Sequence, residues 1–286
     1  MPNYKAGKWA HKILSLQNED GSWGYFHTLS ATSDKPYTTE QALRRLEVLG
    51  FTIEDACIKR IVDYMSDCLL GKNDIPDRVE KSCDWNVFRD LMLATWIRRF
   101  IDENEAANKV ASLWANIIVQ AFKQGRYSHE QYIESYQTTF GNKPHGGRLT
   151  DFVSFYQVSL LQGELDKQTE SLMFDYILNK KDGIYYIYEN CITSIPSKFQ
   201  NKSVSRYLGA VELLCGYKNN AHKLEFIGDW LEEQRIKNSV WDMGAVAKDN
   251  VYFPLSDRWD SNSRIIDCTY RIENILKKIK AGKDST

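Results

Sequence analysis

Hydrophobic residues recur every three or four positions along most of the chain, which is the spacing of one face of an α-helix. Ile58, Ile61 and Met65 are one example, and Gly71 ends their stretch. An alternating pattern of strand length occurs at most in the short segment 184–188. The pattern predicts an all-α protein with helices at residues 6–17, 38–49, 52–70, 84–96, 103–124, 149–161, 165–178, 203–215, 221–235 and 264–280.

The first of these helices ends in a turn that contains Gln17, Gly21 and Trp23. Gln can bond the unpaired backbone groups at a helix end, Gly allows the positive φ of a tight turn, and Trp lays a large ring against the helix. Similar turns recur at separations of 104, 58 and 56 residues, each with an aromatic anchor: Trp23, Tyr127, Tyr185 and Trp241. A glycine turn at residues 70–75 divides the longest gap, with Ile in place of the ring. A period of roughly 55 residues predicts five helical hairpins, each with a charged outer and an apolar inner helix, in one domain over residues 1–286.

The spacing Gln-x3-Gly-x-Trp at Gln17, Gly21 and Trp23 resembles the QW repeat of the superfamily of squalene–hopene cyclases and protein prenyltransferase β-subunits. The fifth turn keeps Trp241 but has Ser239 in place of Gly, and the turns between them are shortened or have lost the Gln. The resemblance implies an α/α toroid, in which inner helices surround a central cavity and outer helices surround the inner ones. It also implies a hydrophobic, isoprenoid-type ligand in that cavity.

The standard catalytic motifs of this superfamily do not occur in the sequence. It has neither the Asp-x-Asp-Asp acid of class II cyclases nor the Asp-Asp-x-x-Asp motif that holds magnesium. Zinc-dependent prenyltransferases use Asp-x-Cys and a later His, whereas Asp267 and Cys268 are adjacent here and no His follows them. We therefore expect no metal site and no obligatory cofactor, with Mg²⁺ left open.

Charged and aromatic residues gather in the N-terminal turns of the predicted inner helices. In a toroid these helices run in one direction, so the turns would meet at one mouth, where helix N-termini and Arg side chains favour anions and aromatic rings could hold an isoprenoid. The candidate ligand-binding residues are Asp84, Trp85, Arg89, Tyr156, Arg206, Tyr207, Trp259 and Arg264. The candidate catalytic acids are Asp260 and Asp267, with Arg206 and Arg264 as anion clamps. Arg–Asp pairs that only fix neighbouring helices would explain the same residues.

The composition adds three points. A formal net charge of −1 gives no basic surface for nucleic acid. No apolar run approaches the roughly 20 residues of a transmembrane helix, and the N-terminus has no signal-peptide core, so we expect a cytoplasmic protein. Aromatic residues make up 13% of the chain, including 8 Trp and 16 Tyr, which favours a large aromatic interior.

We therefore expect a divergent prenyltransferase- or terpenoid-cyclase-like protein whose central cavity takes an isoprenoid or similar hydrophobic, anionic ligand. One alternative is a non-catalytic binding or scaffold module whose own side chains plug the cavity. Another is an α/α-barrel carbohydrate-active enzyme, in which Asp84–Trp85 and Trp259–Asp260 provide sugar stacking and acid–base groups. The sequence leaves open whether the protein catalyses a reaction.

Overall fold

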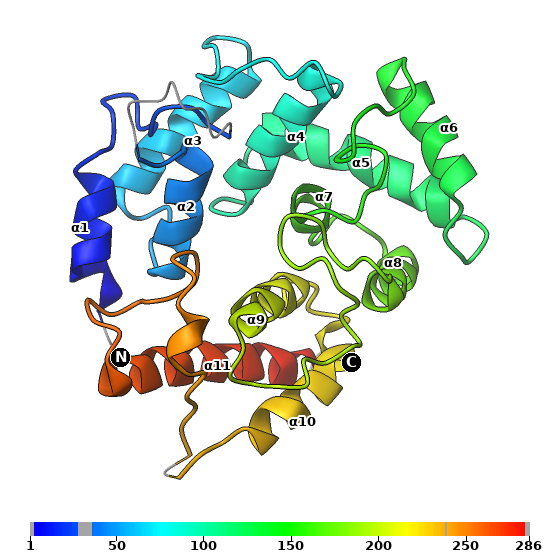
Figure 1. Cartoon of the computed structure of the whole chain (residues 1–286). Coiled ribbons are helices and arrows are strands. Elements are labelled where there is room, and N and C mark those ends of the chain that lie inside the picture. Colours follow the sequence, from blue (N-terminus) through cyan, green and yellow to red (C-terminus); the bar gives the residue numbers. More distant parts are fainter. Residues whose placement is uncertain (1–2, 28–35, 238, 284–286) are drawn as a thin grey trace. The chain divides into compact units, whose positions relative to one another are not determined.

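The protein is seen in a computed structural model that describes residues 3–27, 36–237 and 239–283. Over these residues the chain forms α-helices and short 3₁₀ helices, and its only extended contacts are isolated bridges (Figure 1). The predicted all-α class is confirmed for the described residues. The helices are η1 (Tyr4–Ala6), α1 (Lys8–Leu14), α2 (Thr39–Val48), α3 (Ala56–Leu69), α4 (Trp85–Arg98), α5 (Glu105–Phe122), α6 (His129–Phe140), α7 (Phe155–Leu160), α8 (Lys167–Asn179), α9 (Lys202–Leu214), η2 (Ala221–Leu224), α10 (Glu225–Glu233), η3 (Ala245–Ala247) and α11 (Ser261–Lys283).

The chain separates into two compact units, Met1–Ser112 and Leu113–Thr286, with the division inside α5. In the first unit α3 packs against α4, and α1 contacts α2. In the second unit α11 packs against α10 and η2, while α9 contacts α7 and η3 (Figure 1). Each unit has fully buried Trp, Tyr or Phe side chains of its own. One domain over residues 1–286 stays a prediction.

In the first unit, Trp23 joins the helix before its turn to the helix after it. The indole ring is fully buried, and its Nε1 donates to the carbonyl of Ile13 in α1 at 2.7 Å. The backbone N–H of Trp23 donates to Thr39 Oγ1 at the start of α2 at 2.9 Å. We refer to these two hydrogen bonds as the Trp23 bracket.

Gln17 and Gly21 complete the same turn. Gln17 Nε2 donates to the carbonyl of Gly21 at 3.0 Å and to that of Cys57 in α3 at 2.9 Å. Gly21 has a φ of 94°, and a Cβ at this position would lie 2.8 Å from the backbone nitrogen of Ile61. Glycine is therefore required both by the left-handed backbone and by the close approach of α3.

The second unit contains a bracket with the same two hydrogen bonds. The buried Trp241 donates from Nε1 to the carbonyl of Leu231 in α10 at 2.6 Å, and from its backbone N–H to Thr269 Oγ1 in α11 at 3.1 Å. Ser239, two residues before Trp241, has a φ of 58° and so occupies the left-handed region that Gly21 occupies in the first unit. We refer to this arrangement as the Trp241 bracket.

Several helices differ from those that the sequence pattern predicts. The predicted helix at 52–70 begins only at Ala56, and the predicted helix at 221–235 is divided into η2 and α10. The pattern does not predict α6, which buries Tyr132 and Tyr136. The predicted helix at 149–161 is limited to α7, because the Ser154 hydroxyl caps the helix by accepting from the Tyr156 amide at 3.2 Å. In addition, α11 begins at Ser261, three residues before the predicted start.

Candidate functional site

Asp84 and Asp260, two of the predicted site residues, lie directly before helices and bond to backbone amides. Asp84 caps α4 by accepting from the amide of Val87 at 3.5 Å. Asp260 accepts from the amide of Ser263 in the first turn of α11 at 3.0 Å. That hydrogen bond lowers the pKa of the exposed Asp260 carboxyl, which is therefore ionised near neutral pH. A catalytic role for Asp260 stays a prediction.

Asp267 and Arg264, both in α11, bind to the loop that precedes this helix. The fully buried Asp267 accepts from the amides of Leu255 and Ser256 at 2.8 and 2.9 Å and from the Ser256 hydroxyl at 2.5 Å. Arg264 donates two hydrogen bonds to Asp242, at 2.6 and 2.8 Å. This bidentate contact is the main reason that the pKa of the Asp242 carboxyl is lowered. Both α11 residues therefore hold the loop in place.

The predicted tryptophans are half-buried and contact their own loops or helices. Trp259 donates from Nε1 to the carbonyl of Ala245 at 3.0 Å, and its ring lies 5.3 Å from that of Phe253. Trp85 lies 6.2 Å from Phe88, centroid to centroid, within α4. Both rings therefore have apolar neighbours on one side and partial solvent exposure on the other.

Arg89, Tyr156, Tyr207 and Arg206 differ in burial. Arg89 donates to the neighbouring Asp90 at 2.9 Å. Tyr156 and Tyr207 are fully buried, and the Tyr207 hydroxyl donates to a backbone carbonyl at 3.1 Å. Arg206, next to Tyr207 in α9, is exposed. Of these four side chains, Arg206 is the most accessible to a ligand.

The predicted residues are divided between the two units. Trp259, Asp260, Arg264 and Asp267 belong to one continuous segment, the end of a loop and the start of α11. Asp84, Trp85 and Arg89 lie in the first unit, and the remaining predicted residues lie in the second. A common mouth for the two sets stays a prediction.

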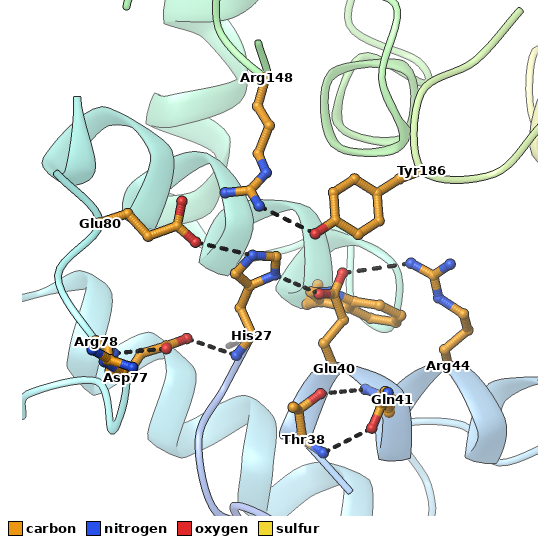
Figure 2. Close-up of polar contacts among 11 residues, drawn as sticks. His27, Thr38, Glu40, Gln41, Arg44, Asp77, Arg78, Glu80, Arg148 and Tyr186 are labelled. Atoms are coloured by element: carbon orange, nitrogen blue, oxygen red, sulfur yellow. Dashed lines mark hydrogen bonds and ion pairs between the residues drawn. The ribbon is translucent and has the colours of Figure 1, made fainter. Parts of the chain in front are cut away.

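The first unit contains a charged cluster around the buried residues His27 and Glu40, which the sequence pattern does not predict. We refer to it as the His27 cluster, and it consists of His27, Glu40, Arg44, Glu80 and Trp96 (Figure 2). His27 Nδ1 lies 3.1 Å from Glu40 Oε2, and His27 Nε2 lies 3.4 Å from Glu80 Oε1. Glu40 also accepts from Trp96 Nε1 at 3.2 Å and from Arg44 at 3.5 Å. Both imidazole nitrogens therefore face carboxylates.

The start of α2 places His27 and Glu40 beside each other. Thr38 caps this helix in a capping box with Gln41, at 3.1 and 3.2 Å. The amide of Glu40 donates to the carbonyl of Phe26 at 2.9 Å, which aligns the chain before His27 with the first turn of α2. These bonds fix the backbone on both sides of the imidazole–carboxylate contact.

The loop before α4 completes the cluster. The carboxylate of Asp77 accepts from the backbone amide of His27 at 2.6 Å (Figure 2). The carbonyl of Pro76 accepts from the amide of Phe26 at 2.9 Å. The His27 ring also meets Phe88 of α4 edge-on, with 5.3 Å between centroids. His27 thus connects α2, the 76–80 loop and α4 within the first unit.

The charge on Glu40 depends on these neighbours. Burial alone would raise the pKa of the Glu40 carboxyl, but the hydrogen bond from His27 and the charges of Arg44 and His27 outweigh it and lower the pKa. Glu40 is therefore a buried carboxylate that keeps its charge near neutral pH. Such a group can orient an imidazole or stabilise a positive charge, whereas donating a proton is unfavourable for it.

A second buried charge lies in the other unit. Arg271 of α11 donates to Glu212 of α9 at 2.8 and 2.7 Å and to the hydroxyl and carbonyl oxygens of Ser205, each at 3.0 Å. Its guanidinium also lies 4.3 Å from the ring centroid of Tyr252 and 5.1 Å from that of Phe253. Burial alone would lower the pKa of Arg271, but the charge of Glu212 outweighs it and raises the pKa. This arrangement fastens α11 to α9.

A further contact involves Arg148 and Tyr186 of the second unit. Arg148 donates to the Tyr186 hydroxyl at 3.2 Å, and the guanidinium carbon lies 5.5 Å from the ring centroid (Figure 2). The predicted residue Tyr156 meets the same ring edge-on at 5.8 Å. Among the described residues, no group of three or more His, Cys, Asp or Glu side chains is arranged to hold a metal ion.

The chain has no match among known protein families, curated proteins or solved structures. The resemblance to the cyclase and prenyltransferase superfamily therefore rests on the residues of the turns and stays a prediction. In the described part of the chain, none of the helices has both the length and the apolar character needed to cross a membrane.

Proposed function

We propose that the chain is a divergent relative of the prenyltransferase and terpenoid-cyclase superfamily, folded as an α/α toroid of about five outer–inner hairpins. In this proposal its aromatic interior binds an isoprenoid or a similar ligand with a hydrophobic body and an anionic head. The observation that carries the proposal is the repeated bracket. Trp23 and Trp241 make the same two kinds of hydrogen bond, at turns near the two ends of the chain. A turn that recurs with its hydrogen bonds is what a repeat of helical hairpins requires.

Arg206 is the residue that we assign to the anionic head. It is exposed near the start of α9, and no hydrogen bond or ion pair joins its side chain to another residue in the part of the chain that the structure describes. A planar guanidinium matches the geometry of phosphate oxygens and can bind two of them. Asp260 and Asp267 remain the proposed catalytic carboxylates; because Asp260 is ionised near neutral pH, it would act by stabilising a positive charge on the ligand. The proposal holds with or without Mg²⁺.

A second function, a non-catalytic binding or scaffold module, is favoured by the contacts of Arg264 and Asp267. Arg264 uses its guanidinium on Asp242, and Asp267 uses both carboxylate oxygens on residues 255–256. Side chains engaged in this way stabilise a loop without any substrate. Product analysis after incubation with isoprenoid diphosphates separates the two functions, because a module binds without turnover.

Thermal-shift and calorimetric titrations with farnesyl and geranylgeranyl diphosphate, with and without Mg²⁺, test the proposal. A ligand that binds only the native state stabilises it by about 2.7 kcal/mol at a concentration of 100 times Kd. We expect a higher Tm for the wild type and weaker binding for Arg206→Ala. Lys202→Ala is the matched control, because Lys202 is also exposed at the start of α9. No shift with either diphosphate would contradict the proposed ligand.

A further inference from the structure

One face of α4, near the start of the helix, carries a half-buried aromatic ring beside an ion pair. The face consists of Trp85, Asn86, Arg89 and Asp90, which lie one and four positions apart and are therefore neighbours on the helix surface. Asn86 is exposed, whereas Trp85 is half-buried and its ring centroid lies 6.2 Å from that of Phe88. An aromatic ring with an apolar neighbour on one side and solvent on the other can stack on a ligand.

Arg89 and Asp90 form the polar part of this face. Nε and Nη2 of Arg89 lie 2.9 and 2.8 Å from the same carboxylate oxygen, Oδ1 of Asp90. Within the described part of the chain, neither side chain has another hydrogen bond or ion pair. A guanidinium has five N–H donors, of which this pair uses two. The two side chains are 33% and 37% exposed, so the remaining donors and the second carboxylate oxygen are accessible to a ligand.

Arg89 satisfies the Asp90 carboxylate only in part. Burial raises the pKa of the Asp90 carboxyl, and the hydrogen bond and charge of Arg89 do not fully offset it, so the pKa lies above its ordinary value. A further hydrogen bond to the charged form would lower this pKa again. Asp242 and Asp260 differ in this respect, because their hydrogen bonds hold the pKa of each carboxyl below the ordinary value. Asp90 is therefore an acceptor that gains from an additional donor.

The chemistry of the pair selects the ligand. A charged ligand is disfavoured, because an anion is repelled by Asp90 and a cation by Arg89. A hydroxyl group suits the pair, since one oxygen atom can accept from Arg89 and donate to Oδ2 of Asp90. A nucleobase edge suits it less well, because Oδ1 already faces two nitrogens of Arg89 and the carboxylate cannot use both oxygens on the base.

We propose that Trp85, Arg89 and Asp90 form a binding site for a neutral sugar. Trp85 stacks on the C–H face of the sugar ring, and one hydroxyl of the sugar bridges Arg89 and Asp90. Asn86 lies one helical turn before Asp90, where its amide can bond to a neighbouring hydroxyl. The inference goes beyond the proposed function, which assigns an anionic head to Arg206 in the second unit. The sugar site belongs to the first unit, so either proposal can fail without the other.

Saturation-transfer difference NMR and titration of the full chain labelled with ¹⁵N-tryptophan test the site. The probes are the methyl glycosides of glucose, mannose, galactose and N-acetylglucosamine, with adenosine as the nucleobase probe. Concentrations up to about 50 mM cover dissociation constants in the millimolar range. Trp85→Phe assigns the indole resonance, and the binding variants are Trp85→Ala and Asp90→Asn.

Two control variants are matched to these within the first unit. Trp9→Ala removes another half-buried tryptophan, and Asp63→Asn removes the charge of a carboxylate that pairs with Lys59 at 2.9 Å on α3. Circular dichroism checks that each variant is folded.

We expect at least one glycoside to shift the Trp85 indole resonance of the wild type. The same glycoside should bind about tenfold or more weakly to Trp85→Ala and Asp90→Asn, because the first loses the stacking ring and the second the charged acceptor. The Trp9→Ala and Asp63→Asn controls should bind it like the wild type. Equal binding in all variants, or an equal loss in the controls, overturns the site. Binding of adenosine without any glycoside overturns the sugar as its ligand, and so does the absence of binding by all four glycosides.

Discussion

The Trp23 and Trp241 brackets have the same hydrogen bonds but different turns. In both, an indole N–H donates to a carbonyl of the preceding helix and the backbone N–H donates to a threonine hydroxyl of a following helix. The first turn adds Gln17, which bonds to Cys57 of α3, and needs glycine at position 21. The second turn has Ser239 in the left-handed region instead. The comparison indicates that the tryptophan and the threonine define the bracket, while Gln and Gly depend on what packs against the turn.

Close in sequence to the threonine of each bracket lies a buried charged residue, and the two charges have opposite signs. Glu40 follows Thr39 in α2 and is the acceptor of the His27 cluster. Arg271 lies two residues after Thr269 in α11 and is the donor to Glu212 and Ser205. Both charges are almost fully buried. The same kind of bracket thus occurs next to a buried carboxylate in one unit and a buried guanidinium in the other.

The largest effect is expected from removing either indole. Trp23→Ala and Trp241→Ala should each lower the free energy of unfolding by about 4 kcal/mol, because each opens a large cavity and removes a buried hydrogen bond to a helix carbonyl. Urea unfolding followed by circular dichroism measures this loss. Trp259→Ala is the control and should cost clearly less, because that ring is half-exposed. If one variant lost much more free energy of unfolding than the other, the two brackets would not be equivalent.

The next largest loss of unfolding free energy is expected for Glu40→Gln. This variant removes the buried negative charge that faces His27 and Arg44. We expect a loss of about 3 kcal/mol at neutral pH, whereas the exposed Glu54→Gln should change little.

This effect should depend on pH. Because the pKa of Glu40 is lowered in the folded protein, its stabilisation is complete above the unfolded value and is lost as the pH falls through the folded value. The gap between wild type and Glu40→Gln should therefore narrow at acidic pH in urea titrations. A gap that widens on acidification would contradict the assigned charge.

Gly21→Ala tests why the first turn needs glycine. The new Cβ would lie 2.8 Å from the backbone nitrogen of Ile61 and would occupy a left-handed backbone, so we expect a loss of about 2 kcal/mol or more. Gly125→Ala serves as the control for backbone strain alone, since Gly125 has a φ of 75° and nothing within 4 Å of its Cβ position. Equal losses in the two variants would show that the contact with α3 contributes nothing.

Ser239→Gly should have the smallest effect, with the opposite sign. It relieves a left-handed serine and should raise the free energy of unfolding by up to about 1 kcal/mol. Thermal unfolding of this variant beside the wild type provides the measurement. A decrease in Tm would mean that the serine side chain supports the turn, and the two turns would then differ more than their φ angles suggest.

The sequence predicts the features that depend on local spacing. Helix periodicity identifies ten of the described α-helices approximately, and the spacing of Trp23 from its helix indicates a structural turn. The short hydrophobic face of α6 is interrupted by charged and polar residues, and the pattern misses it. Residue type alone indicates Asp260 and Asp267 as candidate acids. The helix-start contact of Asp260 is local, whereas the contacts of Asp267 depend on how the loop before α11 folds.

The His27 cluster could not be predicted in the same way. Glu40 contacts His27, which precedes it by 13 residues in the sequence, and Trp96, which follows it by 56 residues. In the sequence, Glu40 resembles any acidic residue in the first turn of an amphipathic helix, where it would ordinarily be exposed. Only the packing of α2 against its neighbours turns it into a buried carboxylate.

The equivalence of the two brackets is tested most directly by hydrogen exchange of the indole N–H groups in protein labelled with ¹⁵N-tryptophan. Trp23→Phe and Trp241→Phe assign the two resonances. The account predicts that both indoles exchange slowly, since each N–H is buried and bonded to a carbonyl at 2.7 or 2.6 Å, and that Trp259 exchanges faster. Rapid exchange of the indole N–H of either Trp23 or Trp241 would contradict the claim that the same bracket occurs in both units.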